Sequence, residues 1–360
     1  MISQALLYLC FSLLMGTFLL YWIPKSYRTD IFVPKGLLLV AVIGIAILSF
    51  IPVFHLILYL APEFGFGQST RFVLFSFEVG KAWIFTFIVS IILFIFVIWF
   101  DYRKKFLFAS LGVILTFILV LTLGWSSHAS TYDKVWGFSS HSLHLTAVSV
   151  WVGTLLVASW FSKDHANWLN FLKWFSPVAV VCFVSTLLTG LILMSFVMEF
   201  NEYTFSWLLP YGQALLIKHI LIIPLLIFVI INSIFIRKRL NRDYRYDPRP
   251  WARIESINIM LIFSATAALG QQSPPHETAV SNEEVSSLFK VFHQGPFYPE
   301  MTVQLILNPV SIALSIITAL SVTLIIFIFF KKGLPIFSFI ISVLLVFCVY
   351  LSLILSISLY

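Results

Sequence analysis

Two histidines three residues apart form the clearest metal-binding pattern in the sequence. His141 and His144 lie within an apolar segment, and residues at this spacing project from the same side of a helix. Two imidazoles arranged in this way can bind one ion, and imidazole suits copper, zinc, iron and nickel. His128, shortly before this segment, is a candidate third ligand. The alternative is that these histidines serve only as hydrogen-bonding groups.

Further candidate ligands lie within other apolar segments. His55 and His219 are examples, and an imidazole there is costly unless it is paired, coordinated or facing a cavity. Met194 and Met198 are four residues apart, and thioethers favour Cu(I). Methionine pairs in apolar helices more often serve packing. Three weaker candidates lie in a long connection: His276, His293 and Met301.

Charged side chains accompany these candidates. Glu78 and Lys81 are three residues apart and can pair, Lys218 directly precedes His219, and Glu199 follows the methionine pair. Lysines near the ends of apolar segments usually extend to the membrane interface. If they turn inward instead, they can set the local field or hold a carboxylate or propionate-like group.

The elements that must position these residues are membrane-spanning helices. Hydrophobic residues make up 60% of the 360 residues and charged residues only 10%, against about 25% charged residues in soluble domains. Ten continuous apolar segments are long enough to cross a hydrocarbon core of about 30 Å, without the alternation of barrel strands. We therefore expect an all-α, polytopic transmembrane helix bundle with about ten spanning helices. The segments cover approximately 4–23, 36–60, 79–100, 106–124, 139–160, 172–198, 212–236, 254–270, 309–330 and 335–358.

The basic residues predict how these helices cross the membrane. Seventeen of the 22 Lys and Arg residues lie in alternate connections, seven of them within 237–253. Because positive loops stay in the cytoplasm, both termini are expected outside the cytoplasmic (plasma) membrane. Seven of the eight histidines then lie on or near the outer side. The longest connection, 271–308, is an extracytoplasmic loop or cap that separates eight helices in 1–270 from a final pair in 309–360.

The sequence also excludes several classes of function. It contains no GxxxxGK[ST], HExxH, GxSxG or GxGxxG motif, so we expect neither ATP hydrolysis nor another enzymatic activity. The net charge of +7 comes largely from loops suited to contact the anionic lipids of the bilayer. We therefore expect no nucleic-acid partner.

Residues between about 120 and 275 carry a family pattern. They are His128-Ala129, His141-Ser142-Leu143-His144-Leu145, Val150-Trp151-Val152-Gly153, Phe175-Ser176-Pro177, Thr189-Gly190, Tyr211-Gly212 with Leu215, Leu216 and Lys218, then Glu255 and Ser273-Pro274-Pro275. In this order and spacing they resemble the copper resistance protein D family. The resemblance implies an inner-membrane protein that moves copper, often alongside a soluble extracytoplasmic copper-binding protein. It also implies histidines at the outer end of the helix that contains His141.

The leading hypothesis is copper transport, with uptake as the expected direction. Copper is captured outside by the three histidines between 128 and 144, with help from the candidates in the cap, and passes inward by ligand exchange along the His and Met residues of the bundle. A copper sensor or assembly factor, which binds without transport, is a second possibility.

A haem-binding membrane protein, similar to a cytochrome, is the alternative from another class. Histidines on different helices of a bundle are a common way to hold haem. His55, His144 and His219 are then candidate axial ligands, with Lys81 or Lys218 near the propionates.

Overall fold

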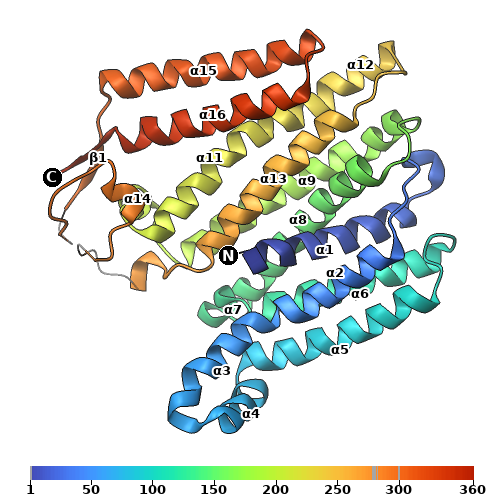
Figure 1. The fold of residues 1–360 in the computed structure, drawn as a ribbon, viewed down its shortest axis with the longest axis horizontal. Helices are drawn as coiled ribbons and strands as arrows, with labels where there is room; N and C mark the ends of the chain where they lie inside the picture. Colours follow the sequence, from blue (N-terminus) through green and yellow to red (C-terminus); the bar gives the residue numbers. More distant parts are fainter. Residues whose placement is uncertain (1, 278–280, 282, 299–300) are drawn as a thin grey trace. The chain divides into compact units, whose positions relative to one another are not determined.

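The computed structural model describes residues 2–277, 281, 283–298 and 301–360. It consists of two compact units, here called the N-terminal unit (Ile2–Phe196) and the C-terminal unit (Val197–Tyr360). Almost all regular structure is helical, and the described strands β1 (Val303–Leu305) and β2 (Ile357–Leu359) have three residues each. Figure 1 shows the course of the chain. The predicted all-α class is confirmed, and the predicted division at residues 270 and 308 stays a prediction.

Ten helical spans within the described residues are long and apolar enough to cross a membrane. They correspond one to one with the ten predicted segments, although several boundaries differ. The sixth span ends at Ser195, so Met198 lies beyond it, where the prediction had a helix to residue 198. The tenth helix ends at Ile354 and is followed by β2, where the prediction had a helix to residue 358.

The N-terminal unit contains six of these spans. Its elements are α1 (Ile2–Trp22), η1 (Lys25–Tyr27), α2 (Lys35–Leu48), α3 (Phe50–Phe64), α4 (Phe66–Ser76), α5 (Glu78–Trp99), α6 (Phe106–Trp125), α7 (His128–Tyr132), α8 (Trp136–Phe161) and α9 (Trp168–Ser195). The second span consists of α2 and α3, which meet at Ser49. The hydroxyl of Ser49 donates to the Ile45 carbonyl, an arrangement that bends helices.

Close backbone contact joins α1 to α8. A Cβ atom added to Gly16 would lie 2.0 Å from the Gly153 carbonyl oxygen, and one added to Gly153 would lie 2.1 Å from the Ser12 carbonyl oxygen. Because lipid provides no hydrophobic force between spanning helices, small residues that allow such close packing hold them together. α8, which carries the histidine pair, is therefore fixed against α1 through glycine.

The C-terminal unit contains the other four spans and a cap. Its elements are η2 (Phe200–Glu202), α10 (Tyr203–Ser206), α11 (Pro210–Ile230), η3 (Ile231–Phe235), α12 (Ile236–Arg242), α13 (Arg249–Leu269), η4 (Pro275–Glu277), α14 (Ser287–Lys290), β1, α15 (Pro309–Phe330), α16 (Pro335–Ile354) and β2. α11 packs along α13 and α15 along α16. The π-helical turn η3 continues the α11 span into α12.

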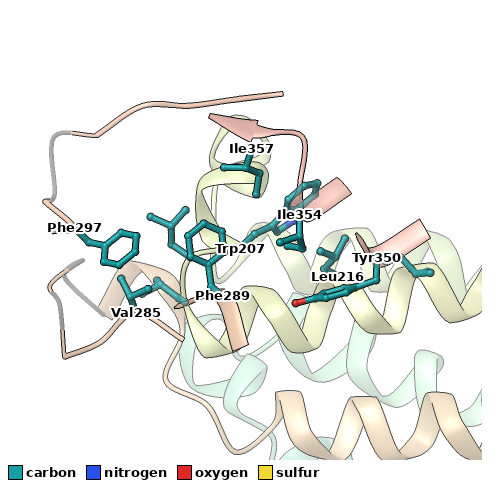
Figure 2. Packing of buried hydrophobic residues seen from close by; sticks show 11 residues of the cluster. Trp207, Leu216, Val285, Phe289, Phe297, Tyr350, Ile354 and Ile357 are labelled. Carbon is teal, nitrogen blue, oxygen red and sulfur yellow. The ribbon is translucent and has the colours of Figure 1, made fainter. Parts of the chain in front are cut away.

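The cap, meaning the described residues within 271–308, packs onto the ends of α11 and α16. Phe289 is fully buried there with Trp207 and Ile354, as Figure 2 shows. β1 pairs antiparallel with β2, so the chain after α16 turns back and pairs with the cap. The connection that follows α13 is therefore held by apolar packing and by strand pairing.

We predict that Gly153→Ala destabilises the protein by about 1–3 kcal/mol, because the new methyl group overpacks the contact with α1. Thermal unfolding of the detergent-purified protein measures this change. Gly36→Ala on α2 is the control, since a Cβ there meets no atom within 4 Å. Equal unfolding temperatures for the two variants would contradict the packing account.

Candidate metal-binding residues

The start of α8 is shaped by the turn before it. The Asp133 carboxylate accepts hydrogen bonds from the backbone N–H groups of Val135 and Trp136, at 2.9 and 2.8 Å. A Cβ atom added to Gly137 would lie 1.9 Å from the Ala129 carbonyl oxygen, so α7 packs directly on this first turn. These contacts fix where α8 begins, and hence where its histidines lie.

His141 and His144 both lie on α8 and are both half-buried. Their spacing puts them on the same side of this helix, as predicted. His128 is the first residue of α7, and its side chain lies outside the described part of the structure. The sequence thus predicts the placement of the pair on one helix, while the third ligand stays a prediction.

A chain of hydrogen bonds sets the proton on the His144 ring. Nδ1 of His144 lies 3.0 Å from the Thr189 hydroxyl on α9. That hydroxyl has one proton, and its short 2.6 Å bond to the Ser185 carbonyl takes it. With the proton in that bond, the Thr189 oxygen accepts and Nδ1–H of His144 donates. In the neutral ring the lone pair then resides on Nε2, which is the electron pair through which imidazole binds a metal.

Gly190 provides space beside this ring. A Cβ atom at this position would lie 3.6 Å from Cε1 of His144, which leaves room for an alanine but not for a large side chain. The Thr189-Gly190 pair thus has a physical role: one residue orients the imidazole, and the next lets it lie against α9. The sequence pattern includes both residues but does not show what they contact.

His219 has a different partner in the C-terminal unit. Its Nδ1 lies 2.6 Å from the Tyr203 hydroxyl. Burial raises the pKa of the Tyr203 phenol to about 12, so this residue of α10 keeps its proton at neutral pH. The phenol either donates to Nδ1 or accepts from Nδ1–H, and only the second arrangement puts the lone pair on Nε2. Sequence reasoning missed Tyr203, because it is 16 positions from His219 with helix ends between them.

The cap histidines bind backbone carbonyls. Nε2 of His293 lies 2.9 Å from the Ile354 carbonyl oxygen, and its ring stacks on Phe289 with centroids 4.6 Å apart. Nδ1 of His276 lies 2.8 Å from the Val197 carbonyl oxygen. A carbonyl only accepts, so both nitrogens donate N–H. Met301 packs against the apolar cluster of the cap. All three predicted cap ligands therefore take part in holding the cap in place.

The remaining predicted ligands are dispersed. His55 is exposed on α3, whose Val53 and Ile57 face the small core with α4. Met194 is half-buried at the end of α9, and Met198 lies beyond that helix with 4% of its surface exposed. These residues thus lie on α3, at the end of α9 and beyond α9, and the predicted His and Met relay stays a prediction.

The structure also describes the predicted charge partners of these ligands. Lys81 forms an ion pair with Glu78 at 3.0 Å, and the second oxygen of Glu78 accepts from the Trp125 indole at 2.9 Å. Lys218 is partly buried and Glu199 is exposed. Within the described residues, no three His, Cys, Asp or Glu side chains lie together as a metal site. Of the predicted ligands, His141 and His144 thus share the helix α8, and a third ligand beside them stays a prediction.

We predict that Thr189→Val lowers copper affinity about 10–100-fold. The substitution removes the oxygen that orients His144. Losses of about this size follow when the hydrogen-bond partner of a metal-binding histidine is removed. Thr186→Val is the matched control, because its hydroxyl donates only to the Cys182 carbonyl on the same helix. Titration of the purified protein with Cu(I) in a competing chelator measures both affinities. Equal losses in the two variants would show that the hydrogen bond does not orient a ligand.

Comparison with known proteins agrees with the sequence pattern. Residues 169–269 match the family model of Copper resistance protein D. Copper transport protein CutJ of Bacillus subtilis (strain 168) is 27% identical over 341 residues, which cover 87% of this chain and 57% of CutJ. The chain thus spans little more than half the length of this relative, and no solved structure matches it. The predicted resemblance is confirmed: residues 169–269 of this multi-pass membrane protein, here called the copper resistance protein D region, match the model of that family.

Proposed function

We propose that this protein transports copper across the cytoplasmic membrane and that His141 and His144 bind the ion first. The observation that carries the proposal is the hydrogen-bond chain from His144 through Thr189 to Ser185, because it puts the ring's lone pair on Nε2. Thr189 and His219 lie in the copper resistance protein D region. The copper transport function named for CutJ supports the choice of ion.

The proposed orientation follows from charge. The basic segment 237–253 faces the cytoplasm by the positive-inside rule, and this puts the histidine end of α8 and both termini outside. Inward movement of a cation then gains about 2.3 kcal/mol per charge for each 100 mV of membrane potential. Uptake is therefore the direction that the membrane potential alone can drive. A soluble extracytoplasmic copper-binding protein is the proposed donor of the copper ion.

The proposed chemistry is ligand exchange. Copper is the transported ion and forms no lasting bond, so each ligand must bind it reversibly. A pair of imidazoles one turn apart offers two equivalent nitrogen donors to one ion. His219, oriented by Tyr203, is proposed as a further ligand in the C-terminal unit. His55, the methionines and the cap residues stay predicted ligands.

We predict that the double variant His141→Ala/His144→Ala reduces copper entry into proteoliposomes at least tenfold relative to the wild type. The physical reason is the loss of both nitrogen donors at the first site. His165→Ala, in the connection between α8 and α9, is the matched control and retains flux. Copper inside the vesicles is measured by mass spectrometry.

The outcomes separate the hypotheses. Wild-type entry no faster than in empty vesicles, with copper still bound by the pure protein, would favour a sensor or assembly factor. A Soret band in the purified protein would favour the haem alternative. Unchanged flux in the double variant would remove the α8 histidines from the route.

A further inference from the structure

A buried carboxyl group that is not among the predicted ligands lies in the C-terminal unit. Glu255 is six residues into α13, and only 3% of its surface is exposed. Asn232, itself 7% exposed, donates to Oε2 of Glu255 at 2.6 Å. The same amide nitrogen lies 3.3 Å from the Trp251 carbonyl oxygen. Ionisable groups at such positions in spanning helices are costly and mark ion or proton pathways.

The helix that carries Asn232 is irregular at this point. Asn232 lies in the π-helical turn η3, and Pro224 interrupts the hydrogen bonds of α11 two turns earlier. A second buried amide, Asn258 on α13, donates to the Leu221 carbonyl at 3.2 Å. π-helical turns are frequent at functional sites. In transporters, broken helices that meet buried polar groups commonly hold the coupling ion.

Within the described residues Glu255 has no ion pair, and the group that donates to it is a neutral amide. Of the elements packed against α13, η3, α15 and α16 carry no charged residue; the titratable groups of α16 are Cys348 and Tyr350, and those of α11 are Tyr211, Lys218 and His219. On α13 itself, Arg249 pairs with Asp247. Arg253 lies two residues before Glu255, an offset at which side chains on a helix do not face each other.

A carboxylate in this position therefore needs a proton or a bound cation to neutralise it. Carboxylate oxygens are hard ligands and suit Cu(I) poorly, whereas imidazole and thioether groups suit it well. A proton fits a site where only 3% of the Glu255 surface is exposed, and the amide of Asn232 can bond the carboxyl group in both of its states. The same two residues can thus exchange a proton without losing the contact between α13 and η3.

We propose that Glu255 is a proton-binding site that takes up and releases one proton in each transport cycle, so that copper movement is coupled to proton movement. The step is the acid dissociation of one carboxyl group; no bond to copper and no electron transfer is involved. The inference rests on the proposed copper transport, and Asn232 is a positioning residue for the carboxyl group.

The first test is independent of copper. Infrared difference spectra between neutral and alkaline pH, a range in which exposed carboxyl groups are already ionised, should show the C=O stretch of a protonated buried carboxyl group in the wild type. Glu255→Gln keeps an oxygen that accepts from Asn232 and removes the titration, so we expect this band to disappear. Glu283→Gln, at an exposed position of the cap, is the matched control and keeps it. The same band in all three proteins would overturn the proposal.

The second test measures coupling in proteoliposomes. If one proton moves with each copper ion, a gradient of one pH unit changes the copper accumulated at steady state about tenfold in the wild type. In Glu255→Gln we expect copper binding to be unchanged and accumulation to be independent of the gradient. Glu255→Asp, which restores a carboxyl group, should recover part of the dependence.

The outcomes of this second test are distinguishable. No copper entry with the wild type would refute the proposed function, while the infrared result would still decide whether Glu255 binds a proton. Copper entry that is independent of pH in the wild type, or pH dependence that survives in Glu255→Gln, would overturn the coupling.

Discussion

Lipid offers no hydrogen-bond partners, so a polar group inside a membrane is costly unless it forms its hydrogen bonds within the protein. In the N-terminal unit this constraint joins His144 to Thr189 and Thr189 to Ser185. In the C-terminal unit it joins His219 to Tyr203 and Asn232 to Glu255. The bonds of His144, His219 and Asn232 each connect two elements, and the bond from Thr189 to Ser185 lies within α9. The contact that joins α8 to α9 therefore also determines which nitrogen of His144 can hold a metal.

Backbone packing provides the frame for these bonds. α1 and α8 approach so closely at Gly16 and Gly153 that neither position has room for a methyl group. A helix held in this way has little freedom to rotate, so His144 keeps its direction towards α9. In the C-terminal unit the cap is fixed by the buried Phe289 and by β1 pairing with β2. Rigid support of this kind is what a reversible binding site requires.

The spans could be predicted because membrane helices are read from length and apolar composition alone, and all ten are present. Helix ends were less predictable, because they depend on local contacts: α9 ends at Ser195, before Met198, and β2 replaces the last turns expected of α16. The placement of the two histidines on one side of α8 followed from helical spacing. The roles of Thr189, Tyr203 and Asn232 could not be predicted, because they arise from contacts between elements far apart in sequence. The cap histidines showed that an imidazole outside the apolar segments can instead bind a backbone carbonyl.

The account depends most on copper binding through the imidazoles of α8. Copper K-edge X-ray absorption of the copper-loaded protein tests this directly, because imidazole rings give a characteristic multiple-scattering pattern. The account predicts this pattern in the wild type and its loss or clear reduction in His141→Ala/His144→Ala. An identical spectrum from both proteins would contradict it.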